Sequence, residues 1–199
     1  MRPEWYADKR DLVKWSVLIT LAKKNNIKRV VYVVYLGESN WLPIQIDEKK
    51  SDLPREVLTH FRDIADIKRM ENKELKITII DAPFRQEDRG AYTASLLRSI
   101  KGISENIILF LDPDTGLEPP NGKASEKHIK EDELSDIWTA LRKDSFLVLY
   151  QHAPQYKRNG WISPKKQQFA GCLEINEKDT SVGNSFGIEN DVIFLMAKK

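Results

Sequence analysis

Three segments of this chain are apolar on both faces of a strand, and they constrain the fold more than any other feature. They are residues 29–36, 107–111 and 145–150. β-Branched and other apolar residues fill each run, without the polar alternation of a strand that has one side in water. Such strands occupy the middle of a parallel sheet that helices cover on both faces. The sequence therefore predicts an α/β fold.

Segments with the apolar spacing of a helix separate these strands. In residues 8–24 apolar side chains recur every three or four positions, at Leu12, Trp15, Ile19 and Ala22. Further helices are predicted over 54–70, 88–101, 131–143 and 165–175, and further strands over 75–80, 184–188 and 191–196. Strands that alternate with helices form βαβ units. We therefore expect one domain over residues 1–199, a Rossmann-like three-layer sandwich with a mainly parallel sheet and an antiparallel C-terminal strand.

Charge, cysteine content and hydropathy exclude several classes of protein. The 199 residues contain 32 Lys and Arg against 30 Asp and Glu, a formal net charge of +2. This balance excludes a uniformly basic nucleic-acid coat but allows a local basic patch. The single Cys172 cannot form an intrachain disulfide or a cysteine metal cage. No signal-peptide core and no run near the ~20 apolar residues of a membrane span is present, so we expect a cytoplasmic protein.

Polar residues follow each of the predicted strands. In an open α/β sheet the carboxyl ends of the strands surround the ligand. The residues that reach this edge are Gly37 and Glu38 after the first strand, Asp81 after the second, Asp112 and Asp114 after the third, and Gln151 and His152 after the fourth. We expect these residues to form one site, in which His152 is a general base, a metal ligand or a hydrogen-bonded structural imidazole.

The sharpest signal is the Asp-Pro-Asp-Thr-Gly sequence from Asp112 to Gly116. A carboxylate at a strand end can accept hydrogen bonds from an amino group, and Asp112 with Asp114 offers the hard oxygen ligands that Mg²⁺ prefers. The same residues also fit a plain turn. One alternative is therefore a magnesium-dependent nuclease or phosphotransfer enzyme, with Lys14 or His152 assisting at the phosphate.

Cations and aromatic residues interleave in residues 156–166. Lysine and arginine can contact phosphates while tyrosine and tryptophan stack on unpaired bases. An exposed loop with one anchoring tryptophan would have the same composition. Because this stretch leaves the fourth strand, we expect it to lie over the site and to bind RNA or DNA. Its candidate contacts are Tyr156, Lys157, Arg158 and Trp161.

The start of the first helix contains a second group of charges. Asp8 or Asp11 can cap the helix. Asp11 and Lys14 are three residues apart and therefore face the same side. A paired Asp and Lys can also orient a substrate, so Asp11 is a candidate for substrate binding and Lys14 a candidate catalytic residue.

Two pieces of the chain resemble the single-domain, Rossmann-like ribosomal RNA adenine amino-group methyltransferases. The stretch Asp11-Leu12-Val13-Lys14-Trp15 is similar to their N-terminal Ala-Asp-Val-Leu-Lys-His stretch, and Asp112-Pro113 resembles the start of their Asp-Pro-Pro-Tyr motif. Asp114 and Thr115 stand where that motif has its second proline and its aromatic residue. The sequence therefore also fits a methyltransferase fold with an altered function.

The resemblance implies S-adenosylmethionine as the methyl donor. It places Asp112 at the target amino group and Lys14 near the substrate. Asp81 would read the ribose of the donor, as acidic residues do in nucleotide-binding Rossmann folds, with Gly37 and Glu38 beside it. We therefore expect a methyltransferase-like protein that acts on nucleic acid. A non-catalytic binding module on the same scaffold stays open.

Overall fold

A six-stranded sheet in the order β4-β1-β5-β8-β10-β9 forms the centre of the protein. The computed structural model describes residues 6–37, 44–46, 49–52, 54, 57, 63–120, 124–153, 160–185 and 187–199. Strands β4, β1, β5 and β8 are parallel neighbours, and β10 pairs antiparallel with both β8 and β9. The strands are β1 (Arg29–Val33), β4 (Lys76–Ile80), β5 (Ile108–Leu111), β8 (Phe146–His152), β9 (Thr180–Ser185) and β10 (Glu189–Lys198). This confirms the predicted α/β fold with antiparallel pairing at the C-terminal end.

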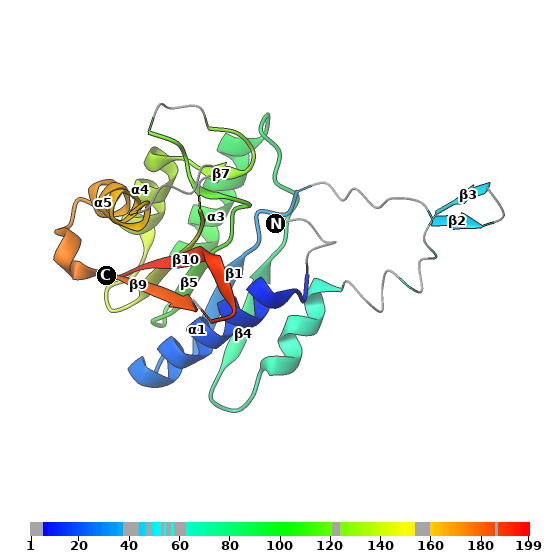
Figure 1. Ribbon diagram of the computed structural model, residues 1–199. Coiled ribbons are helices and arrows are strands. Elements are labelled where there is room, and N and C mark those ends of the chain that lie inside the picture. Colours follow the sequence, from blue (N-terminus) through cyan, green and yellow to red (C-terminus); the bar gives the residue numbers. More distant parts are fainter. Residues whose placement is uncertain are drawn as a thin grey trace.

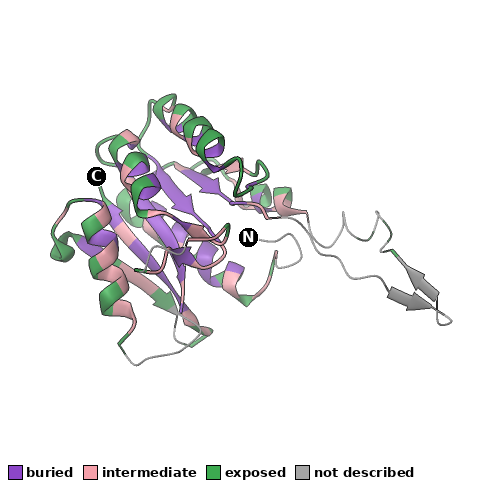
Figure 2. Cartoon of the chain, turned by 90° about the horizontal axis from the view of Figure 1, so that it is seen from above, coloured by how far each residue is buried: buried purple, intermediate pink, exposed green. Residues whose placement is uncertain are grey.

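Helices cover both faces of the sheet (Figure 1), and the central strands β1, β5 and β8 are mostly buried (Figure 2). Leu18 of α1 lies in one core cluster with Tyr32 and Phe110. The neighbouring strand residues Val31 and Leu109 point to the opposite face and lie in a second cluster, beneath α3, α4 and α5. The helices are α1 (Lys9–Asn25), α3 (Arg89–Lys101), α4 (Glu131–Ala140) and α5 (Ile162–Cys172). None of the described helices is long and apolar enough to cross a membrane.

Local signals determine where α1 begins and ends. The Asp8 side chain accepts hydrogen bonds from the backbone N–H groups of Arg10 at 2.7 Å and Asp11 at 3.0 Å, as an N-cap does. Asn26 ends the helix in the left-handed conformation, with φ 52°. The observed helix therefore matches its predicted range to within one residue.

Shorter elements complete the described structure. They are the 3₁₀ helices η2 (Ile64–Met70) and η3 (Glu177–Asp179), the antiparallel pair β2 (Ile44–Ile46) and β3 (Lys49–Ser51), and the parallel pair β6 (Gly116–Leu117) and β7 (His128–Ile129). The end of the helix predicted over 54–70 is thus a 3₁₀ helix, and most of residues 53–62 lie outside the described residues.

Two observed strands differ from their predicted ranges, because strand pairing, which the local sequence does not indicate, determines where they begin and end. β8 continues through His152 because its pairing with β10 extends to Val192. β9 begins at Thr180, opposite Ala197, and ends at Ser185, so the strand predicted over 184–188 was placed too late. Both differences arise because β10 is long enough to pair with β8 as far as His152 and with β9 from Thr180 onward.

Candidate site at the carboxyl edge of the sheet

The order in which the chain adds strands to the sheet changes direction at β1. From β1 it passes to β4 on one side, and the following strand, β5, pairs with the other side of β1. Ligands of open α/β sheets bind outside the carboxyl ends of the strands at such a switch point. Val33 of β1 is level with Ile80 of β4 and with Leu111 of β5. Asp81 follows the end of β4 and Asp112 follows the end of β5, the two strands that flank β1. Both residues therefore lie at one edge of the sheet, as we expected.

A buried cluster of polar side chains joins α1 to the end of β5. Lys14 Nζ donates to Asp112 Oδ2 at 2.8 Å and lies 3.0 Å from Asp11 Oδ1. The Tyr32 hydroxyl donates to the same Asp112 oxygen at 2.7 Å. The side chains of Asp112 and Lys14 are only 2% and 6% exposed. The structure thus brings three predicted site residues, Asp11, Lys14 and Asp112, into one cluster and adds Tyr32, which sequence reasoning placed in the core.

Burial and charge together determine the protonation of this cluster. Burial raises the pKa of Tyr32 well above its ordinary value, and the carboxylate of Asp112 acts in the same direction. For Lys14 burial acts to lower the pKa, but the charges of Asp112 and Asp11 outweigh it and raise the pKa. Burial raises the pKa of Asp11, although the ammonium group of Lys14 opposes this. Lys14 therefore stays charged, and Tyr32 stays a neutral hydrogen-bond donor.

The two carboxylates of the Asp112 turn differ in their surroundings. Asp112 is buried, whereas Asp114 is half-buried in the turn beyond the strand. Among the residues that the structure describes, no group of three or more His, Cys, Asp or Glu side chains could hold a metal ion. Glu38, the third carboxylate of the edge, lies outside the described residues. The magnesium site and the role of Asp112 in substrate binding both stay predictions.

His152 is the last residue of β8, and both of its ring nitrogens face oxygen atoms. Nε2 lies 3.2 Å from Asp191 Oδ2, and Nδ1 lies 3.0 Å from the carbonyl oxygen of Ala153. Arg10 Nη2 donates to the same Asp191 oxygen at 2.7 Å. Burial acts to raise the pKa of Asp191, but the hydrogen bond from Arg10 and the charge of His152 outweigh it and lower the pKa. This contact favours the structural role of His152 over that of a general base.

Sequence reasoning missed Arg10 and Asp191 as members of this group. They are 181 positions apart, and no local pattern connects them. Their contact fastens the first turn of α1 to β10.

An exposed carboxylate and a packed aromatic group mark the other side of β1. Asp81 is exposed at the end of β4. Nearby, Tyr35, Phe84 and Tyr92 pack against one another, with ring centroids 4.9 to 5.4 Å apart. Tyr35 has φ 47°, a left-handed conformation that bulky residues rarely adopt. The chain therefore turns out of β1 at Tyr35, two residues before Gly37.

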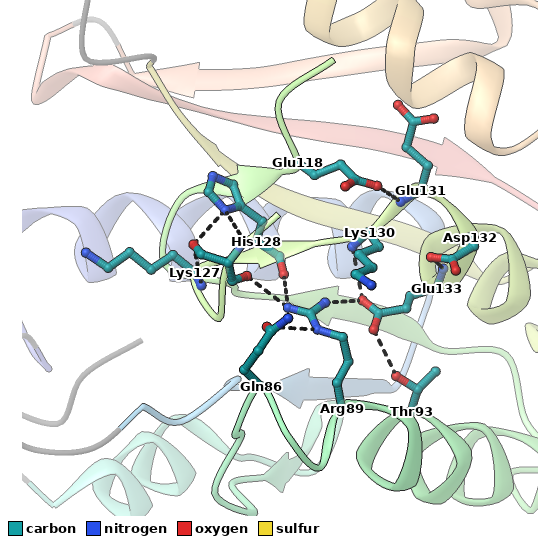
Figure 3. A network of polar contacts seen from close by, with 11 residues as sticks. Gln86, Arg89, Thr93, Glu118, Lys127, His128, Lys130, Glu131, Asp132 and Glu133 are labelled. Atoms are coloured by element: carbon teal, nitrogen blue, oxygen red, sulfur yellow. Dashed lines mark hydrogen bonds and ion pairs between the residues drawn. The ribbon is translucent and has the colours of Figure 1, made fainter. Parts of the chain in front are cut away.

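Arg89 of α3 holds α4 through a buried ion pair, and it holds the segment between β5 and α4 through hydrogen bonds (Figure 3). Arg89 Nη1 contacts Glu133 Oε2 at 2.6 Å, and both side chains are less than a tenth exposed. Arg89 Nη2 donates to the carbonyl oxygens of Ser125 at 2.9 Å and His128 at 3.0 Å. Sequence reasoning did not place Glu133 at a site, because its ion-pair partner Arg89 is 44 positions away in the chain.

The predicted nucleic-acid contacts are only partly described. Tyr156, Lys157 and Arg158 lie outside the described residues. Trp161 is half-buried and packs against the core cluster beneath α3, α4 and α5. Its ring therefore contributes to packing at the start of α5.

Comparisons with known proteins identify no relative. No protein-family model matches the chain, and neither does any curated protein or any solved structure. Any functional assignment therefore depends on the residues of this chain.

Proposed function

We propose that this chain is a methyltransferase-like protein that binds S-adenosylmethionine at the carboxyl edge of its sheet and acts on nucleic acid. One observation carries the proposal: the strand order has its switch point at β1, with Asp81 and Asp112 at the ends of the two strands that flank it. This is the position where doubly wound sheets bind nucleotide cofactors.

The residues at the end of β4 fit such a ligand. Asp81 is an exposed carboxylate beside β1, and a carboxylate there can accept hydrogen bonds from ribose hydroxyl groups. After β1 the sequence offers Gly37 alone, but the left-handed backbone of Tyr35 supplies a turn at the same strand end. When bound, S-adenosylmethionine would supply an electrophilic methyl group.

The residues at the end of β5 divide into a buried support and an accessible carboxylate. Asp112 holds Lys14 and Tyr32 at 2.8 and 2.7 Å, and in this proposal it fixes α1 over the site. Asp114, half-buried in the same turn, is the carboxylate that accepts hydrogen bonds from the target amino group. The resemblance assigns that contact to Asp112, whose burial makes Asp114 the better candidate.

Calorimetric titration with S-adenosylmethionine tests the proposal. We expect micromolar binding that Asp81→Asn weakens by roughly tenfold to a hundredfold, since a hydrogen bond to a charged group contributes about 1.5–3 kcal/mol. Asp136→Asn, the same change at an exposed position of α4, is the matched control and should bind as the unmodified protein does. No binding, or equal affinity in both variants, would show that the proposal is wrong.

A separate titration with Mg²⁺ tests the alternative enzyme class. Binding of Mg²⁺ that Asp114→Asn abolishes, without binding of S-adenosylmethionine, would favour the nuclease or phosphotransfer reaction. If neither ligand binds, a non-catalytic binding module is the better description.

A further inference from the structure

Gln151 uses its side-chain amide to hold the turn that follows β5. The residue lies in β8 and is 3% exposed. Its Nε2 group donates to the carbonyl oxygen of Thr115 at 2.9 Å, and its Oε1 accepts from the N–H of Leu117 at 2.9 Å. The same Nε2 group donates to the carbonyl oxygen of His152 at 2.8 Å. The buried amide of Gln151 therefore makes the hydrogen bonds to the backbone of the turn that a neighbouring strand would otherwise make.

Gly116 lies between these two contacts and leaves the space that the amide fills. A Cβ atom on Gly116 would lie 2.5 Å from Gln151 Cδ and 2.8 Å from Nε2. Gly116 also has φ 106°, a conformation that side chains rarely adopt. Gln151 and Gly116 thus interlock, because a side chain at the second position would displace the first.

The opposite side of the turn is fastened as well. The backbone N–H and the hydroxyl of Thr115 both donate to the carbonyl oxygen of Lys127, at 2.9 and 2.8 Å. On the side of β8, the carbonyl oxygen of Thr115 also accepts from the N–H of His152 at 3.1 Å. With contacts to two segments, the turn has one orientation, and Asp114 is carried by the backbone immediately before it.

We propose that Gln151 is a positioning residue for the site. It orients the turn from Asp112 to Leu117 and so places Asp114 for its contact with the ligand, without touching the ligand itself. This inference depends on the proposed function, because Asp114 is the carboxylate assigned to the target amino group. A residue that acts through Asp114 must lose its influence when the Asp114 carboxylate is removed, whereas a general support of the fold keeps its influence.

A thermodynamic cycle on binding separates these two roles. The ligand is an S-adenosyl compound joined to the amino nitrogen of an adenosine, so that it carries the target amino group. Its affinity is measured for the unmodified protein, Gln151→Met, Asp114→Asn and the double variant. Each is measured at a temperature where circular dichroism shows it folded. We expect Gln151→Met to weaken binding by roughly tenfold or more, because small displacements of site groups have large effects. In the Asp114→Asn background the same change should alter affinity by less than about twofold. Gln167→Met, at an exposed position of α5, is the matched control.

Equal weakening by Gln151→Met in both backgrounds would overturn the positioning role while the proposed function stands. If neither this ligand nor S-adenosylmethionine binds the unmodified protein, the proposed function and the positioning role both fail. The interlock itself then has a separate test that needs no ligand.

Urea unfolding supplies that test. We expect Gly116→Ala to lower the unfolding midpoint more in the unmodified protein than in a Gln151→Ala background, where the overlapping amide is absent. Gly171→Ala in α5, where a Cβ meets nothing within 4 Å, should have the same effect in both backgrounds. If Gln151→Ala does not fold, Gln151→Asn, whose amide is one methylene shorter, replaces it. Equal shifts for Gly116→Ala in both backgrounds would overturn the interlock.

Discussion

At the scale of single residues, Lys14 supplies a buried positive charge at the candidate site. Its ammonium group is shared by the carboxylates of Asp112 and Asp11, and it lies 4.7 Å from the ring centroid of Tyr150. All of these groups are buried, so the charges are stabilised by one another and not by water. Removing the ammonium group would leave two carboxylates in a site of low polarity.

Lys14→Met should therefore destabilise the protein strongly. Breaking a buried ion pair by removing one partner costs about 3–5 kcal/mol, and methionine keeps most of the volume of lysine. Urea unfolding at neutral pH measures this loss. Lys9→Met, an exposed position on the same helix, should change the free energy of unfolding by less than about 0.5 kcal/mol. A similar small change for Lys14→Met would contradict the buried ion pair.

At the scale of elements, three polar side chains from three different elements hold the segment between β5 and α4. Arg89 of α3 holds the carbonyl oxygens of Ser125 and His128, and Gln151 of β8 holds the turn after β5. Lys165 of α5 donates to the carbonyl oxygens of Leu117 and Glu118, at 3.1 and 3.0 Å. Burial lowers the pKa of Lys165, while the charge of Glu131 opposes this change. These three side chains therefore hold the segment through its backbone carbonyl oxygens.

Arg89→Met should destabilise the segment between β5 and α4 more than the rest of the protein. The change leaves the Glu133 carboxylate buried without its ion-pair partner and should cost about 3–5 kcal/mol. Hydrogen exchange followed by mass spectrometry should show faster exchange in residues 124–130 and in β6 and β7, with little change in β1. Arg98→Met, on the exposed side of the same helix, is the control. Faster exchange spread evenly over the sheet would contradict the local role of Arg89.

At the scale of the whole molecule, the sheet buries phenol groups on both of its faces. Tyr32 and Tyr150 lie in the cluster beneath α1, and Tyr35 and Tyr92 lie in the opposite cluster. Burial is the largest cause that raises the pKa of each of these four groups above its ordinary value of 10.0. The folded state therefore binds these protons more tightly than the unfolded state does.

Alkaline pH should consequently unfold the protein and ionise its tyrosines in the same transition. A raised pKa in the folded state contributes stability that is fully present below the unfolded pKa and is lost as the pH rises above it. We expect the free energy of unfolding to fall from about pH 10 upward, with Lys14 adding to the loss above its ordinary 10.5. Tyrosinate absorbance and circular dichroism, recorded together, measure both events. Ionisation of most of the six tyrosines while the circular dichroism stays unchanged would contradict this prediction.

The sequence by itself determined the fold class, most of the helices and strands, and the edge of the sheet at which the candidate residues Asp81 and Asp112 lie. These features depend on local patterns: the period of apolar residues, the caps of α1, and the rule that the carboxyl ends of parallel strands share one edge. For that reason the sequence predicts Asp81, Asp112 and Asp114 at one edge.

Only the tertiary structure decided which of these side chains touch and which are buried. Lys14 and Asp112 are 98 positions apart, and the Arg10–Asp191 contact spans 181. Asp112 is buried against Lys14 of α1, and the amide of Gln151 occupies the space left by a glycine 35 residues before it. Such contacts join segments that are distant in the chain, and no local pattern of residues encodes which two segments the sheet brings together.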